Sequence, residues 1–425
     1  MRILILSQWY IPEPDIKIHL LGKSLVERGH QITAITGFPN YPQGRIYPDY
    51  HQRPCQWEHR DGVRVLRVPL YPDHSCSGVK RIINYLSFAA SASVLGPLLC
   101  GPADVMWVYH PPLTVGIPAW WIGLLRRVPF VYEIQDMWPE TVIASGMMSN
   151  GVAIRSLSRL AQFVYRRATA ITVISPGFKR DLISKGVPAE KIHIIPNWAD
   201  EEIYRPLPRD EGLAAEHGLT GRFNVVYGGN MGAAQGLHNV VEAATLLRDL
   251  PEVQFVFIGD GVDQDALHQM VQERKLENVR FLGRQPAQEM PRFFALADVL
   301  LVHLKRDPLF EITIPSKTLA YLACGRTILG VVAGDPADVI RRAGAGVISP
   351  QEDPSALSQT VRTLYAMDPD ERELMGRRGR KAFLENYTRA VLVDRYEMLL
   401  QEVAQQRKSF ITAPKGGISK RGGDG

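Results

Sequence analysis

The sequence predicts an α/β protein made of two Rossmann-like domains, each built on a doubly wound parallel sheet. Short aliphatic and β-branched runs alternate with amphipathic segments along the whole chain, which is typical of parallel sheets covered by helices on both faces. The chain has 425 residues, of which 45% are hydrophobic, and this is enough for two cores. A polar stretch with Pro206 and Pro208 separates the runs into two series. We therefore expect an N-terminal domain over residues 1–200 and a second domain over residues 201–407.

Each series of apolar runs predicts the strands of one sheet. In the first domain the expected strands cover residues 3–7, 31–36, 63–68, 105–109, 130–134, 171–174 and 192–195. In the second domain they cover residues 224–227, 254–258, 279–282, 299–303, 328–332 and 346–348. Two last helices, at 368–385 and 389–407, are expected to close the second domain. The tail 408–425 is rich in glycine and charge, so we expect it to be disordered.

Charge and cysteine content narrow the class of protein. The formal net charge is +5, and the basic excess lies in scattered pairs such as Arg126-Arg127, Arg166-Arg167 and Arg341-Arg342. Such pairs favour an anionic ligand or an acidic membrane surface over nucleic acid, although solvated helix faces explain some of them. The four cysteines have neither metal-ligand spacing nor a disulfide framework, and the chain starts in a strand pattern rather than a secretory signal. We expect a cytoplasmic protein without a metal ion.

The apolar stretch 82–100 is open to three interpretations. It has no formal charge, but Asn84, serines and Pro97 interrupt it, so a transmembrane span is disfavoured. A helix in the membrane interface, with Lys80 and Arg81 at its head to meet anionic lipid, fits better. A buried helix of the N-terminal domain fits equally well.

A glycine-rich loop, residues 227–237, leaves the first strand of the second domain and opens a helix. Its candidate ligand-binding residues are Gly228, Gly229, Asn230, Gly232, Gln235 and Gly236. Such a loop lets a phosphate approach backbone N–H groups at a helix N-terminus without a metal. The loop has the pattern neither of a Walker motif nor of a dinucleotide fingerprint. The alternative interpretation is a tight strand-to-helix turn.

Two further loops are expected on the same rim of the second sheet. Gly259 and Gly261 follow the strand at 254–258, and Arg284 follows the strand at 279–282. An arginine offers a fork of donors that suits a diphosphate or a base carbonyl. A surface arginine on a turn is the alternative.

Pro315, Ser316 and Lys317 begin another helix of the second domain. Proline suits the first turn of a helix, and the helix N-terminus with Ser316 can face the same anion. Lys317 is placed to neutralise a leaving group.

In the first domain, Asp136 and His110 end neighbouring predicted strands, with Trp138 and Glu140 close to Asp136 in the chain. A carboxylate and an imidazole at strand ends can take a proton from an acceptor hydroxyl. The alternatives are a helix N-cap for Asp136 and a hydrogen-bonded loop residue for His110. Because open α/β sheets bind ligands at the carboxyl ends of their strands, we expect the site in the crevice between the domains.

These residues together resemble glycosyltransferase family 4, whose members share the two-Rossmann GT-B fold. Its motifs appear in order at residues 10–14, 25–33, 37–44, 133–140, 195–200 and 314–325, within 1–407. The branch that they resemble most is the bacterial L-fucosamine-type transferases of O-antigen and capsule synthesis. The resemblance implies a UDP-sugar donor, no metal, and a polyprenyl-diphosphate-linked acceptor at the inner face of the plasma membrane.

The chain departs from the family pattern at several positions. The two glutamates beside the donor sugar are replaced by Ile312 and Ala320, with Glu311 one residue from the first position. Asn230 and Gln235 stand where the family has an arginine and a lysine, and residues 15–16 replace its first-loop glycine pair. Arg284 and Lys317 become the leading replacements for the lost charges. The stereochemical outcome, retaining or inverting, stays open.

The resemblance and the residues together predict transfer of a hexosamine or deoxyhexosamine from a UDP-sugar to a saccharide acceptor. The 228–236 loop, Ser316, Arg284 and Lys317 would hold the diphosphate, and Asp136 or His110 would assist proton loss from the acceptor. Two alternatives remain: a UDP-sugar epimerase of the same fold, for which carboxylates are few, and a degenerate nucleotide-sugar-binding scaffold, which the lost charges suggest.

Overall fold

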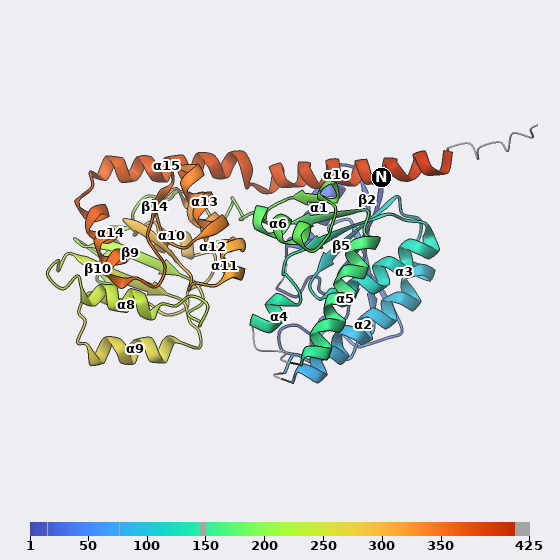
Figure 1. The fold of residues 1–425 in the computed structure, drawn as a ribbon, viewed down its shortest axis with the longest axis horizontal. Helices are drawn as coiled ribbons and strands as arrows, with labels where there is room; N and C mark the ends of the chain where they lie inside the picture. Colours follow the sequence, from blue (N-terminus) through green and yellow to red (C-terminus); the bar gives the residue numbers. More distant parts are fainter. Residues whose placement is uncertain (15, 76, 145–149, 413–425) are drawn as a thin grey trace, which may run out of the picture. The chain divides into compact units, whose positions relative to one another are not determined.

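The structure, a computed structural model, describes residues 1–14, 16–75, 77–144 and 150–412, and Figure 1 shows its ribbon. The chain forms two compact α/β units. Unit 1 comprises Met1–Val173, Ile183–His193 and the chain from Val393 onward. Unit 2 comprises Ile174–Leu182 and Ile194–Leu392. The predicted fold class, two doubly wound parallel-sheet domains, is confirmed.

Unit 1 contains an eight-stranded sheet in the order β3-β4-β2-β1-β5-β6-β7-β8. The strands are β1 (Arg2–Leu6), β2 (Gln31–Gly37), β3 (Gln56–Arg60), β4 (Val63–Val68), β5 (Val105–His110), β6 (Phe130–Ile134), β7 (Ala170–Val173) and β8 (Ile192–Ile194). Its main helices are α1 (Lys17–Glu27), α2 (Gly78–Leu99), α3 (Gly116–Arg126), α4 (Glu140–Ala144), α5 (Gly151–Arg167) and α16 (Arg389–Thr412). The strands from β4 to β7 pair in parallel, whereas β3 is antiparallel to β4 at the edge.

Unit 2 contains a six-stranded parallel sheet in the order β11-β10-β9-β12-β13-β14. The strands are β9 (Phe223–Gly228), β10 (Val253–Ile258), β11 (Val279–Phe281), β12 (Val299–His303), β13 (Ile328–Val331) and β14 (Gly346–Ile348). Its helices are α7 (Glu211–Glu216), α8 (His238–Thr245), α9 (Gln264–Glu273), α10 (Met290–Phe294), α11 (Pro308–Ile312), α12 (Ser316–Cys324), α13 (Gly334–Ala343), α14 (Pro354–Ala366) and α15 (Pro369–Asn386). Helix α6 (Pro176–Ser184) begins in the part of the chain that belongs to unit 2.

The four central strands of unit 2, β9, β10, β12 and β13, are buried on both faces because alternate side chains enter two different cores. Val299 and Leu301 of β12 pack in one cluster, while Leu300 and Val302 pack in the other. Side chains alternate across a strand, so one apolar run supplies both cores. This double burial explains why the runs that predicted the parallel strands are almost continuously hydrophobic.

In both sheets, the order in which successive strands are added reverses at the first strand of the parallel series. In unit 1, β1 lies between β2 and β5, and in unit 2, β9 lies between β10 and β12. The loops at the carboxyl ends of two such strands diverge to opposite sides and leave room for a ligand. This topology puts the glycine-rich loop after β9 and the loops after β1 and β5 at the favoured places.

Helix α16 belongs with unit 1 from Val393 onward, although residues 389–407 were expected to close the second domain. The Lys17 ammonium donates to the Tyr396 hydroxyl at 3.3 Å, and Arg28 and His30 bond to the Glu397 carboxylate at 2.7 and 2.8 Å. These polar partners, all in the N-terminal part of the chain, hold the helix there. The helix reaches Thr412, inside the tail expected to be disordered, and residues 413–425 lie outside the described residues.

Helix α2 is the one helix of the described residues that is long and apolar enough to cross a membrane, with a mean hydropathy of 1.5 over its best window. Its inner face is nevertheless part of the domain. Asn84, which is 2% exposed, accepts from Gln8 at 2.6 Å and donates to the Tyr71 carbonyl at 2.7 Å. One side of α2 therefore packs in unit 1, as the interpretation of a domain helix predicted.

Candidate functional site

The glycine-rich loop after β9 interlocks with the loop after β10. Gly259 and Gly261 have φ values of 140° and 154°, and a Cβ on them would lie 2.0 Å from the Gly229 oxygen and 2.3 Å from the Met231 oxygen. The Gly229 N–H donates to the Ile258 carbonyl, and the Met231 N–H donates to the Asp260 carbonyl. Glycine is required at 259 and 261 because the two backbones touch.

Asn230 and Gln235 are engaged inside the same loop. The Gly232 N–H and the Asn230 amide both donate to the Gln235 side-chain oxygen, at 3.1 and 3.4 Å. The Gln235 carbonyl accepts from Nδ1 of the buried His303 at 2.6 Å. The N–H groups of residues 229, 231 and 232 thus already have partners within the protein. This part of the loop, predicted to bind a phosphate, therefore has the bonding of a tight strand-to-helix turn, which was the alternative interpretation of residues 227–237.

Lys317 lies directly against the carboxyl end of β9. Its ammonium is 3.7 Å from the centre of the Tyr227 ring and donates to the Tyr227 hydroxyl. The same nitrogen lies 3.2 Å from the position of a Cβ built on Gly229. Burial lowers the pKa of Lys317 to about 7, because the ammonium loses hydration. The structure therefore joins Lys317 to the glycine-rich loop, and a bound anion there would favour its charged form.

Lys317 lies in the first turn of α12, so the N-terminus of this helix is part of the same site. Pro315 is the N-cap, no side chain bonds to the helix start, and Ser316 is exposed. Behind this turn, Tyr321 accepts a hydrogen bond from the Gly228 N–H at 2.9 Å and thereby ties α12 to the end of β9. An anion at this helix start would meet the positive end of the helix dipole beside an ammonium.

Arg284 occupies an outer position on the rim. Its side chain is 77% exposed, and its guanidinium is 3.5 Å from the Asp260 carboxylate, itself 54% exposed. An ion pair of this kind contributes little because water screens it. The geometry matches the surface arginine on a turn more closely than a preorganised diphosphate ligand.

The two positions that carry glutamates in family 4 hold apolar side chains in a packed environment. Ile312 packs on α6, where a Cβ on Gly177 would lie 2.4 Å from its Cγ2 atom. Ala320 is 7% exposed. A carboxylate that the sequence analysis missed, Asp335, is nearby: it is 3% exposed and accepts from the Gly177 N–H at 2.5 Å. Asp335 caps the start of α6.

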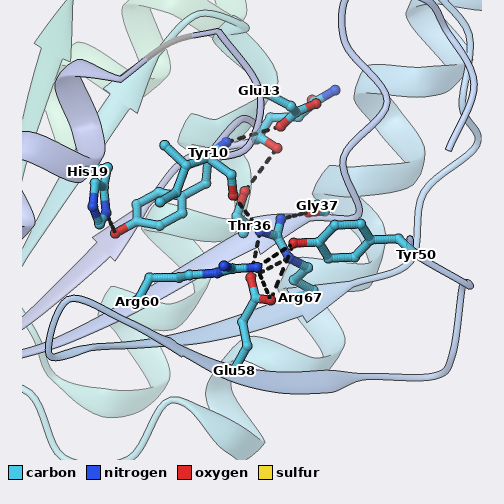
Figure 2. A network of polar contacts seen from close by, with 11 residues as sticks. Tyr10, Glu13, His19, Thr36, Gly37, Tyr50, Glu58, Arg60 and Arg67 are labelled. Atoms are coloured by element: carbon cyan, nitrogen blue, oxygen red, sulfur yellow. Dashed lines mark hydrogen bonds and ion pairs between the residues drawn. The ribbon is translucent and has the colours of Figure 1, made fainter. Parts of the chain in front are cut away.

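In unit 1, a buried polar network joins the loops after β1 and β2, and Figure 2 shows it. Glu13, 1% exposed, accepts from the backbone N–H groups of Tyr10, Asn40 and Tyr41 at 2.9–3.1 Å. Burial raises the pKa of Glu13 to about 7. Glu13 thus fixes the loop of residues 10–14 to the loop of residues 37–44, two of the segments that carry family motifs.

Arg67 completes this network from β4. It is fully buried and donates to the Gly37 carbonyl at 2.9 Å, to the Ile11 carbonyl at 2.5 Å and to Glu58 at 2.7 Å. The Tyr50 ring lies 4.8 Å from its guanidinium carbon. A buried arginine with this set of partners positions the loops and leaves none of its charge uncompensated.

His110 is the best candidate in unit 1 for contact with a reacting group. It is 2% exposed, and neither ring nitrogen has a hydrogen-bond partner among the described residues. Desolvation lowers the pKa of His110 to about 3, so the imidazole is neutral. Its ring centre is 5.6 Å from that of Trp138 and 5.9 Å from that of Tyr132. A buried polar group without a partner points to a ligand or to an ordered water.

Asp136 lies close to His110 in the sheet order, as predicted. His110 pairs with Ile134 across β5 and β6, and Asp136 follows Ile134 by two residues at the same edge of the sheet. Asp136 is partly buried. The structure therefore brings the two candidates to one edge.

An aromatic group at the same edge was not found from the sequence. The rings of Trp9 and Tyr41 are 5.0 Å apart, and those of Tyr41 and His74 are 4.6 Å apart. All three side chains are partly exposed. The loops after β1 and β2 and the loop before α2 supply them, and such rings suit the apolar face of a sugar. Within the described ranges, no three His, Cys, Asp or Glu side chains gather to hold a metal ion.

Two doubly wound units, with a lysine, a glycine-rich loop and a helix start at one sheet edge, form the two-domain GT-B fold of glycosyltransferases. Two family models match the chain: the glycosyl transferase 4-like domain over residues 16–198 and the glycosyl transferases group 1 over residues 212–382. The chain belongs to glycosyltransferase family 4.

Similar proteins include bacterial glycosyltransferases. The putative colanic acid biosynthesis glycosyl transferase WcaI of Escherichia coli is 29% identical over 76% of this chain and 82% of its own. The probable glycosyltransferase WbjE of Pseudomonas aeruginosa is 26% identical over 66% of this chain and 70% of its own. The structure of Anabaena HepE in complex with UDP has a TM-score of 0.71, at 17% identity, over 95% of this chain and all of HepE.

Proposed function

We propose that this protein transfers a sugar from a UDP-sugar to a lipid-linked saccharide acceptor during the synthesis of a cell-surface polysaccharide, without a metal ion. The observation that carries the proposal is the position of the Lys317 ammonium beside Gly229 and the start of α12. Likeness to WcaI, named for colanic acid biosynthesis, supports the polysaccharide role, and the UDP in the HepE complex supports the donor.

In the proposed reaction, unit 2 binds the nucleotide diphosphate. The bond between the sugar C1 and the diphosphate oxygen breaks, an acceptor oxygen bonds to C1, and the acceptor proton passes to a base. Negative charge that develops on the leaving diphosphate is met by Lys317 and the dipole of α12, and each preorganised donor of this kind is worth about 3 kcal/mol. Arg284 reaches the donor only if it leaves Asp260.

Unit 1 is proposed to bind the acceptor. The Trp9, Tyr41 and His74 rings offer a stacking surface for a sugar. Asp136 is the proposed base, and the neutral His110 offers a hydrogen bond to a sugar hydroxyl. The proposed sugar is a hexosamine or deoxyhexosamine, the carrier a polyprenyl diphosphate, and the place of work the cytoplasmic face of the membrane.

A direct assay tests this proposal. The purified protein is incubated with UDP-sugars and a polyprenyl-diphosphate saccharide, in the presence of a chelator, and both UDP release and the product mass are measured. We expect acceptor-dependent UDP release with one additional sugar on the acceptor. UDP release without an acceptor product, or an epimerised UDP-sugar, contradicts the proposal.

The second candidate is a nucleotide-sugar-binding scaffold. The packed, apolar Ile312 and Ala320 at the glutamate positions favour it. A scaffold binds UDP but gives no product with any donor and acceptor pair, so the same assay together with UDP titration separates the two candidates.

A further inference from the structure

The water-facing side of α2 is apolar. Its exposed residues recur at helical spacing as Val79, Lys80, Ile82, Ile83, Leu86, Ala90, Val94 and Leu98. Val94 and Leu98 are 64% and 75% exposed, while the polar Asn84 is buried on the inner side. The inner side is mostly apolar as well, with Phe88, Ala89 and Ala92 buried, whereas a helix on the surface of a soluble domain turns an apolar stripe to the core and a polar face to water. We therefore expect the exposed apolar side of α2 to contact an apolar partner rather than water.

Helix α3 continues the same surface. It packs beside α2, and a Cβ on Gly96 of α2 would lie 2.7 Å from the Ile122 side chain of α3. Trp121, Leu124 and Leu125 of α3 are 38–56% exposed. We call these residues and the exposed apolar residues of α2 the apolar face. In Figure 1, α2, α3 and α5 lie side by side in unit 1.

The three helices that form this layer contain no aspartate or glutamate. Their basic residues, with the following Arg127, are Lys80, Arg81, Arg126, Arg127, Arg155, Arg159, Arg166 and Arg167. Helix α5 packs against α3, where a Cβ on Gly116 would lie 2.4 Å from Val164. Three of its arginines line a hollow of about 630 Å³ together with Phe163. An apolar surface bordered by basic side chains, on helices without acidic residues, matches the boundary between anionic headgroups and acyl chains.

We propose that this protein docks on an anionic lipid bilayer through the apolar face, with the arginines of α5 against the lipid headgroups. Helix α2 then lies along the bilayer surface and does not cross it, because its inner side is part of unit 1. A second copy of the chain is a poorer occupant, since the acid-free helices of two copies would oppose like charges. Docking does not depend on sugar transfer, so its failure and that of the proposed function are measured separately.

The apolar face is connected to the aromatic group of the candidate acceptor site. The Tyr71 N–H donates to Ser87 of α2 at 2.8 Å, and Arg81 donates to the Ser75 carbonyl at 3.0 Å. These bonds fix the loop that carries His74 to α2. A lipid carrier embedded beside α2 would thus present its headgroup next to the aromatic rings.

Co-sedimentation of the full chain with vesicles tests the docking. Vesicles of phosphatidylcholine alone are compared with vesicles that also contain phosphatidylglycerol, at low and high salt. We expect binding to the anionic vesicles, and weaker binding at high salt because exposed charges are screened. Val94→Gln with Leu98→Gln should weaken binding at least about tenfold, since two exposed apolar side chains that would enter the bilayer are lost. Arg155→Gln with Arg159→Gln should weaken it about tenfold, at constant salt.

Matched controls come from unit 2. Val262→Gln removes an apolar side chain that is 87% exposed, and Arg341→Gln with Arg342→Gln removes two exposed charges from α13. Both controls should bind vesicles like the wild type, and all variants should keep UDP binding and melting temperature. The docking proposal is overturned if the wild type does not bind anionic vesicles, or if the Val94→Gln, Leu98→Gln variant binds them as well as the wild type. It is also overturned if the wild type is a dimer and this variant is a monomer.

Discussion

The ammonium of Lys317 lies 3.7 Å from the centre of the Tyr227 ring and donates a hydrogen bond to its hydroxyl. Tyr227 is the next-to-last residue of β9 and Lys317 is the second residue of α12, so the contact joins the two elements that form the proposed diphosphate site. Tyr227 is itself buried, which raises the pKa of its hydroxyl and keeps it neutral. It holds the lysine in place without forming an ion pair with it.

Removing the lysine should abolish most turnover. We expect Lys317→Met to lower kcat about 100-fold or more, because the leaving diphosphate loses a preorganised charge. Lys381→Met, at a side chain 78% exposed on α15, is the matched control and should retain wild-type rates. Tyr227→Phe keeps the ring but loses the hydroxyl, and should lower kcat about tenfold. Equal rates in Lys317→Met and wild type would remove Lys317 from the mechanism.

UDP affinity should depend on pH through Lys317. Burial holds the pKa of this lysine at about 7, so the free protein loses the ammonium as the pH rises above that value. A bound diphosphate favours the charged form, and UDP affinity should therefore fall from about pH 7 to about pH 9. Lys317→Arg stays charged over this range and should show a flatter profile by calorimetry. A profile of identical slope in both proteins would contradict this assignment.

The same burial makes a stability prediction with a definite sign. The unfolded chain binds more protons than the folded protein between the folded pKa of about 7 and the ordinary value of 10.5 for Lys317. Its contribution to the free energy of unfolding should therefore rise with pH in this window. In denaturant unfolding, the wild type should therefore gain stability relative to Lys317→Met from about pH 7 to about pH 10.

Replacing His110 should separate function from stability. His110→Phe removes two buried ring nitrogens that lack partners, so the folded protein should be unchanged or more stable by about 1 kcal/mol. Turnover should nevertheless fall about 100-fold, because a hydrogen bond to substrate is lost. Thermal unfolding and kinetics on the same preparation check both parts. A stable variant with full activity would mean that His110 only fills space.

Glu13 offers a test of the loop network in Figure 2. Glu13→Gln replaces one of two acceptor oxygens with a donor amide opposite backbone N–H groups, and should destabilise the protein by about 1–3 kcal/mol. Because burial raises the folded pKa to about 7 from 4.5, the stabilisation due to Glu13 is complete below about pH 4.5 and declines through about pH 7. Unfolding curves at acid and neutral pH should show this decline only in the wild type.

The strands that are buried on both faces could be predicted from the sequence, whereas the edge strand β3 of unit 1 could not. The run 299–303 is wholly apolar up to its histidine because both of its faces meet a core. Strand β3 was missed because its residues, Gln56–Arg60, are polar and mostly exposed at the antiparallel edge. Helix α16 was assigned to the second domain, whereas from Val393 it belongs to unit 1, because Tyr396 and Glu397 contact residues near the N-terminus.

The candidate site was predictable where a loop follows a strand, and less so where side chains meet across the fold. The glycine-rich loop could be found because it follows β9 directly, and Lys317 because Pro315 and Ser316 mark the start of a helix. Tyr227 was assigned to the end of a strand and the start of the loop without a role of its own, and Arg67 to a strand, because their partners lie 90 and 56 residues away. The exposed position of Arg284 beside Asp260 could not be predicted from the sequence, and its role at the diphosphate stays a prediction.

Calorimetric titration with UDP, GDP and ADP in the presence of a chelator tests the central claim most directly. The account predicts micromolar binding of UDP, no comparable binding of GDP or ADP, and loss of UDP binding in Lys317→Met. Absence of binding by all three nucleotides, or unchanged UDP binding in Lys317→Met, would contradict it.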